Sequence, residues 1–200
     1  VKIITTGEGG MAVTNNSILA NKMERLRSHG ITRDPSEMVS APDGSWYYQQ
    51  LNLGFNYRMT DIQAALGMSQ MTRLDEFVGK RQCIAKRYDD ALAALPLQTP
   101  WQHPDSHSSY HLYPIRLKLG EDEQTQRQVY EALRAAGILV NLHYIPVYRQ
   151  PYFEYKGFKA GYCPEAEQYF KEAISIPMYP SMHKAQEDEV VSCLRELLGA

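Results

Sequence analysis

Residues 54–67 read GFNYRMTDIQAALG, and this stretch joins a polar loop to the clearest helical pattern of the chain. Thr60 and Gln63 match a capping box, which predicts that the helix begins there. Just before it, Asn56 can donate a hydrogen bond to a phosphate and Arg58 can pair with an anion, close to a helix N-terminus that carries partial positive charge. The stretch is typical of an anion-binding site. The alternative is a capped helix whose Arg58 forms a surface ion pair.

The helical spacing of apolar residues continues from Ile62 to Leu95. A pattern longer than about 25 residues is too long for an ordinary core helix. We therefore expect it to link two lobes, with a break near Gly79. Pro96 and Pro100 then mark a change of organisation.

Lys2 lies in the apolar stretch VKII, residues 1–4, which predicts a β-strand. The glycine-rich turn GEGG, residues 7–10, predicts a return into a second strand at residues 11–14. A lysine amine can condense with an aldehyde, and a glycine turn lets a phosphate approach the backbone closely. Lys2 is thus a candidate for a Schiff base, and the alternative is an ordinary strand lysine. A chain that begins inside a strand leads us to expect part of a longer protein.

The segment between residues 31 and 56 shows no clear periodicity. It follows a helix predicted over residues 15–28 and contains the aromatic cluster Trp46-Tyr47-Tyr48. Loops of this length are uncommon in compact domains and are often functional.

The second half of the chain predicts a small α/β or α+β lobe. Its expected elements are strands at residues 111–119, 138–144 and 174–177, and helices at residues 124–136, 166–173 and 184–198. Asn141, Leu142, His143 and Tyr144 end one strand, a place where ligand groups gather in α/β folds. The alternative for His143 is a structural histidine.

The composition narrows the class of protein. The 200 residues are 44% hydrophobic and carry a formal net charge of -2, so the chain can form a core and has no basic face for nucleic acid. Its three cysteines, Cys83, Cys163 and Cys193, form no CxxC pair, which disfavours a metal site and fits a reducing cytoplasm. No apolar run approaches the roughly 20 residues that span a bilayer. We expect a cytoplasmic protein that binds no metal, membrane or nucleic acid.

Three segments together resemble the DegT-type sugar-nucleotide aminotransferases, which are fold-type I enzymes dependent on pyridoxal 5'-phosphate (PLP). The segments are residues 1–10 (VKIITTGEGG), 54–67 (GFNYRMTDIQAALG) and 137–148 (GILVNLHYIPVY). The resemblance implies an α/β fold that comprises the C-terminal part of such an enzyme. Its three parts would be the end of the large PLP-binding domain at residues 1–75, a linking helix at residues 76–95 and a small C-terminal domain at residues 96–200.

The resemblance also implies roles for individual residues. Lys2 would be the catalytic lysine that holds PLP, or its amino form PMP, covalently. Asn56 would reach the cofactor phosphate or the substrate in the neighbouring subunit of a homodimer, and Arg58 would support that contact or meet the carboxylate of the amino donor. The stretch Asn141 to Tyr144 would line the sugar-nucleotide pocket.

A subfamily is indicated by further segments, namely residues 28–34 (SHGITRD), 46–48 (WYY), 111–115 (HLYPI) and 141–144 (NLHY). They look most like the C4 aminotransferases of pseudaminic acid biosynthesis. That resemblance implies transfer of an amino group from L-glutamate to C4 of a UDP-4-keto-6-deoxy-N-acetylhexosamine. The chain begins one residue before the lysine, so we expect the activity to belong to the parent enzyme and this part alone to be inactive.

Two alternatives stay open at this point. Some relatives of these enzymes are PLP-dependent sugar dehydrases, in which histidine replaces the lysine, and Lys2 argues against this reading. The other alternative is a non-catalytic sensor or dimerisation module derived from an aminotransferase.

Overall fold

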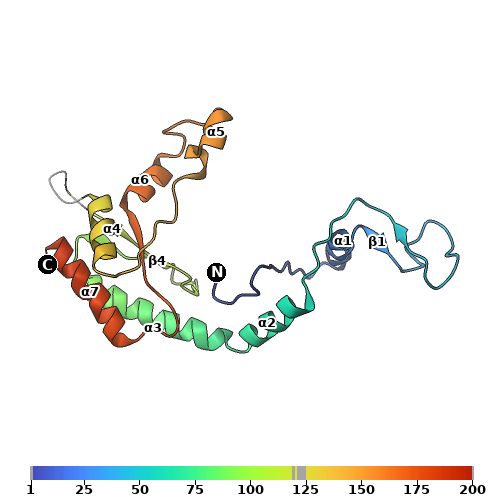
Figure 1. The fold of residues 1–200 in the computed structure, drawn as a ribbon, viewed down its shortest axis with the longest axis horizontal. Helices are drawn as coiled ribbons and strands as arrows, with labels where there is room; N and C mark the ends of the chain where they lie inside the picture. Colours follow the sequence, from blue (N-terminus) through green and yellow to red (C-terminus); the bar gives the residue numbers. More distant parts are fainter. Residues whose placement is uncertain (1, 119, 121–124, 200) are drawn as a thin grey trace. The chain divides into compact units, whose positions relative to one another are not determined.

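The computed structural model describes residues 2–118, 120 and 125–199. The chain divides into two compact units, Val1–Thr72 and Arg73–Ala200. Within the described ranges, each helix is either too short or too polar to cross a membrane. Figure 1 labels the α-helices and some of the strands of both units.

The first unit contains few regular elements. They are helix α1 (Ser17–Arg27), strands β1 (Ile31–Thr32) and β2 (Gln49–Gln50), and helix α2 (Asp61–Met71). The side chain of Asn16 accepts a hydrogen bond from the Leu19 amide at 3.1 Å and so caps α1. The helix expected at residues 15–28 is therefore confirmed, with slightly narrower bounds.

The strands predicted at residues 1–4 and 11–14 are wrong for the described part of these segments. Residues 2–14 contain no strand. A strand exists only where its backbone groups pair with a neighbouring strand, and the described residues supply no such neighbour here.

The segment expected to lack structure contains a short antiparallel ladder. Thr32 in β1 pairs with Gln49 in β2. Gln49 is buried, and its side-chain Oε1 atom accepts a hydrogen bond from the backbone amide of Val39 at 2.8 Å. Its side-chain Nε2 atom donates to the Ser40 hydroxyl at 2.7 Å. Buried polar groups satisfied in this way give the loop a defined path.

The long helical pattern is two helices. α2 ends at Met71 and α3 (Leu74–Leu92) begins after Thr72 and Arg73. The Thr72 hydroxyl donates to the Ser69 carbonyl at 2.9 Å, at the end of α2. The break expected near Gly79 is wrong, because that glycine lies inside α3.

The second unit surrounds a three-stranded antiparallel sheet in the order β3-β4-β5. Its strands are β3 (Leu97–Gln98), β4 (Tyr113–Leu117) and β5 (Ala173–Ile176). Its further helices are α4 (Gln126–Ala135), the 3-10 helix η1 (Val147–Arg149), α5 (Pro151–Tyr155), α6 (Pro164–Glu172) and α7 (Lys184–Leu198). Helices α3, α4 and α7 pack together on this sheet (Figure 1).

The core of the second unit is one apolar cluster. Five of its members are fully buried, namely Tyr88 and Leu92 of α3, Ile115 of β4, Leu133 of α4 and Leu194 of α7. The strands expected at residues 111–119 and 174–177 are confirmed with shorter or shifted bounds, although residue 119 lies outside the described residues. The strand expected at residues 138–144 is instead a single bridge between Asn141 and Ser175.

Candidate active site

The glycine turn lies against the beginning of α2. Gln63 donates its side-chain amide to the Glu8 carbonyl oxygen at 2.8 Å. A Cβ added at Gly9 would lie 2.9 Å from the Met59 methyl carbon and 2.3 Å from the Thr6 hydroxyl oxygen. Two segments separated by 55 positions are thus brought together within the first unit.

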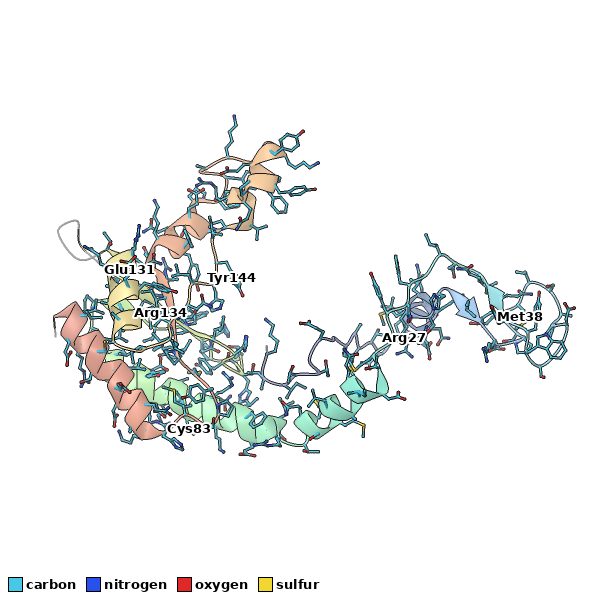
Figure 2. The ribbon with its side chains drawn as sticks, in the orientation of Figure 1. Arg27, Met38, Cys83, Glu131, Arg134 and Tyr144 are labelled. Atoms are coloured by element: carbon cyan, nitrogen blue, oxygen red, sulfur yellow. The ribbon has the colours of Figure 1, made fainter. Side chains whose placement is uncertain are left out.

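The segment before α2 runs along the end of α1. Phe55 and Tyr57 donate their amides to the carbonyl oxygens of Leu26 and Arg27, at 2.7 Å and 2.9 Å. Asn56 forms an isolated antiparallel bridge with Ser28. Figure 2 labels Arg27 on α1. The backbone around Asn56 is therefore held in place, while its side chain is exposed.

Two glycines permit this arrangement. A Cβ at Gly54 would lie 2.2 Å from the Gly30 nitrogen and 2.8 Å from the Leu26 carbonyl oxygen. Gly30 has φ +72, and a Cβ there would lie 1.9 Å from the Asn52 carbonyl oxygen. Because these neighbours are backbone atoms, only glycine allows the two segments to approach so closely.

Three exposed side chains of the first unit could bind a small ligand. Lys2, Asn56 and Arg58 form no hydrogen bond or ion pair with another residue in the described part of the chain. They supply a primary amine, an amide and a guanidinium group. An amine reacts with an aldehyde carbon, whereas an amide and a guanidinium group donate to anionic oxygens. An aldehyde and a phosphate are therefore the ligand groups that these three types of side chain could bind.

The stretch Asn141 to Tyr144 begins at an edge of β5. The Asn141 amide donates to the Ser175 carbonyl oxygen at 3.1 Å, and the Ser175 amide donates to the Asn141 carbonyl oxygen at 2.8 Å. Leu142 packs against the apolar core. The Nδ1 atom of His143 lies 2.9 Å from the Ser175 hydroxyl oxygen.

Tyr144 ends this stretch and is 70% exposed. Its ring contacts the His143 ring edge to face, with centroids 4.8 Å apart. Figure 2 shows the tyrosine side chain projecting outward from the second unit. Of the four predicted residues, Leu142 and His143 thus contact the interior, and Asn141 and Tyr144 face solvent.

A buried arginine supports the strands beside this stretch. Arg81 of α3 is 6% exposed and donates one guanidinium nitrogen to the carbonyl oxygens of Tyr110, His111 and Met178, at 3.0, 3.1 and 3.1 Å. Burial lowers the pKa of this guanidinium group. Its contacts tie the segments that precede β4 and follow β5 to the same helix.

The predicted site residues consequently form two groups, one in each unit. Lys2, Asn56 and Arg58 belong to the first unit, and the stretch 141–144 belongs to the second. The sequence reasoning missed Ser175 as the partner of His143. The available signal was a serine within the apolar strand ISIP, residues 174–177, because a buried hydroxyl needs a hydrogen-bond partner.

Comparisons with known proteins agree over almost the whole chain. The sequence model of the DegT/DnrJ/EryC1/StrS aminotransferase family matches residues 1–195. The spore coat polysaccharide biosynthesis protein SpsC of Bacillus subtilis (strain 168) is 36% identical over 200 residues, which cover 98% of this chain and 51% of that protein.

Solved structures show the same similarity. Helicobacter pylori PseC, an aminotransferase involved in the biosynthesis of pseudoaminic acid, is 29% identical with a TM-score of 0.85, over 100% of this chain and 51% of that chain. The putative sugar aminotransferase Spr1654 from Streptococcus pneumoniae, in its PMP form, is 25% identical with a TM-score of 0.80, over 95% of this chain and 47% of that chain. The chain spans about half the length of these relatives.

Proposed function

The chain belongs to the DegT/DnrJ/EryC1/StrS aminotransferase family, and we propose that its protein is a PLP-dependent sugar-nucleotide aminotransferase. The observation that carries this proposal is the family match over residues 1–195, which includes both Lys2 and the stretch before α2. The exposed amine, amide and guanidinium groups of the first unit supply the chemistry that PLP requires.

The substrate we propose is a UDP-4-keto-6-deoxy-N-acetylhexosamine, aminated at C4 with L-glutamate as the amino donor. The similarity to PseC supports this choice, because it extends over 100% of the chain at a TM-score of 0.85. The segments SHGITRD, residues 28–34, and NLHY, residues 141–144, support it from the sequence.

The proposed site residues would have different roles in binding and in proton transfer. Lys2 would hold the cofactor through its Nζ atom, and the same amine, once released, would move a proton as general base and then as general acid. Asn56 would donate to the phosphate or substrate, and Arg58 would pair with the phosphate or with the glutamate carboxylate. Asn141, Leu142, His143 and Tyr144 would line the sugar-nucleotide pocket. When bound, PLP supplies the electron sink and carries the amino group.

We also propose a homodimer whose active site is shared between subunits. Large apolar side chains of the first unit are exposed, including Tyr57 at 73% and Ile62 at 85%. Exposed apolar side chains of this kind can be covered by a second copy of the chain or by another part of the same protein. Light scattering on the full-length protein should give twice the mass of one chain, and a monomer would contradict the shared site.

The decisive experiment tests whether Lys2 is required for turnover. The full-length protein is incubated with L-glutamate and the 4-keto UDP-sugar, and formation of 2-oxoglutarate and the 4-amino sugar is measured. Lys2→Arg should abolish turnover, because the guanidinium group stays protonated and cannot attack an aldehyde. Lys22→Arg, on α1, is the matched control and should retain turnover.

Borohydride reduction followed by peptide mapping gives a second, independent result. The label should appear on Lys2. Dehydration of the sugar without 2-oxoglutarate would indicate a dehydrase, and the absence of both label and turnover would indicate a non-catalytic module. Labelling of a different lysine would refute the role of Lys2.

A further inference from the structure

The contact between His143 and Ser175 joins residues 32 positions apart in the second unit. Ser175 lies in β5, where all four residues are buried, and is itself 7% exposed. Both of its backbone hydrogen-bonding groups are used by Asn141. The side-chain hydroxyl is thus the remaining polar group of Ser175, and it faces the His143 ring.

The surroundings of the hydroxyl determine which way the hydrogen bond runs. Within the described ranges, the His143 Nδ1 atom at 2.9 Å is the hydrogen-bond partner of the Ser175 hydroxyl. A buried O–H that does not donate leaves its hydrogen unsatisfied, which native interiors avoid. The hydroxyl therefore donates to Nδ1, and in the neutral imidazole the ring proton must then be on Nε2.

The other edge of the His143 ring is free for a ligand. His143 is only half-buried, and its Nε2 atom has no hydrogen-bond partner in the portion of the chain that the structure describes. Asn141 and Tyr144, on either side, are exposed. An N–H at this position can donate to an acceptor oxygen that reaches the stretch 141–144.

We propose that Ser175 is a positioning residue that holds His143 as a neutral hydrogen-bond donor through Nε2, directed at an oxygen atom of the sugar nucleotide. This inference rests on the proposed function for the identity of the ligand. The tautomer and the orientation of the ring rest on the structure of the second unit alone. Ser175 itself does not touch the ligand; it acts through His143.

The first test measures the tautomer directly. In the full-length protein labelled with ¹⁵N-histidine at pH 8, His143→Gln identifies the ring signals of His143. We expect unprotonated Nδ1 and protonated Nε2 in the unsubstituted protein, and a second population with the proton on Nδ1 in Ser175→Ala. A proton on Nδ1 in the unsubstituted protein, or identical spectra for the two proteins, would overturn the proposal.

The second test measures binding of UDP-N-acetylglucosamine by calorimetry. Ser175→Ala and His143→Gln should each weaken binding about five- to tenfold, the loss of one hydrogen bond. The double variant should bind no more weakly than His143→Gln, because Ser175 acts only through that ring. Additive losses would overturn the proposal, since a purely structural effect of Ser175 would persist without the histidine.

Two further variants test whether the loss of affinity in Ser175→Ala is specific to the hydroxyl that contacts His143. Ser106→Ala removes a hydroxyl that donates to the His103 carbonyl oxygen at 2.7 Å on the exposed surface of the same unit, and binding should be unchanged. Ser175→Cys keeps a weak donor and should recover part of the affinity. If the unsubstituted protein binds no UDP-sugar, the proposed substrate class fails, while the ¹⁵N spectrum still decides whether Ser175 sets the tautomer.

Discussion

The two units of the chain are stabilised by different interactions. In the second unit, a continuous apolar cluster extends from Ile84 to Leu194. In the described part of the first unit, the buried residues are Gly30, Thr32 and Gln49, and no large apolar side chain is among them. Apolar burial thus accounts for the second unit, whereas the contacts within the described part of the first unit are close backbone contacts and hydrogen bonds. The same kind of substitution should therefore have different consequences in the two units.

Removing a core side chain of the second unit should have the largest effect. Leu133 on α4 is 0% exposed, and Leu133→Ala should lower the free energy of unfolding of this unit by about 3 kcal/mol, from lost burial and a residual cavity. Urea unfolding followed by circular dichroism measures this loss. Leu139→Ala is the control, because Leu139 is 71% exposed, and it should change stability by less than about 0.5 kcal/mol. Equal losses for the two variants would mean that this core does not carry the stability.

Adding a single methyl group should disrupt the first unit. In Gly54→Ala the new Cβ meets the Gly30 nitrogen at 2.2 Å, and the required backbone shift should cost about 2 kcal/mol. Hydrogen exchange at the Phe55 and Tyr57 amides should accelerate accordingly. Gly10→Ala has nothing within 4 Å of its Cβ and serves as the control. Unchanged exchange in Gly54→Ala would show that the close contact is dispensable.

Two equivalent helix caps allow a direct comparison of the units. Thr60 of α2 and Thr125 of α4 form the same capping box with Gln63 and Gln128. Changing either threonine to alanine should cost about 1 kcal/mol, seen as faster exchange at the Gln63 or Gln128 amide. Only Thr125→Ala should also lower the urea midpoint of the second unit. Serine at either position keeps the hydroxyl and should restore protection, whereas a shifted midpoint in Thr60→Ala would contradict the separation of the units.

The smallest effect concerns an ion pair of the second unit. A hydrogen bond from Gln168, which is the larger cause, and another from Arg116 hold the pKa of Glu172 below its ordinary value of 4.5. A lowered folded-state pKa contributes stability above the unfolded pKa, and this stability is lost as the pH falls from about 4.5 through the folded value. The pair is partly exposed, so the contribution should be below about 1 kcal/mol.

Urea unfolding at pH 7 and at stepwise lower pH tests this loss. Glu172→Gln should be less stable than the unsubstituted protein at pH 7, and the difference should shrink below pH 4.5. Glu131→Gln removes the carboxylate of the exposed pair with Arg127 and is the control for the loss of a surface charge at pH 7, where it should lower stability less than Glu172→Gln does. A constant difference at all pH values would show that the carboxylate does not titrate with unfolding.

Local features of the chain could be predicted well. The capping box at Thr60 and Gln63 and the apolar spacing behind it correctly predicted the start of α2, because both depend on residues within one or two turns. The chemical types needed to bind PLP were likewise visible in Lys2, Asn56 and Arg58. Their assignment to the cofactor stays a prediction, which the lysine experiment tests.

By itself, the sequence determined the family, most of the helices and the types of side chain available for chemistry, since these follow from short-range patterns. The tertiary structure alone decided that residues 2–14 form no strand, that the helical pattern breaks at Thr72 and Arg73, and that Ser175 contacts His143. The physical reason is that strand pairing and buried hydrogen bonds join residues far apart in the chain. Local spacing carries no information about which distant partner will be present.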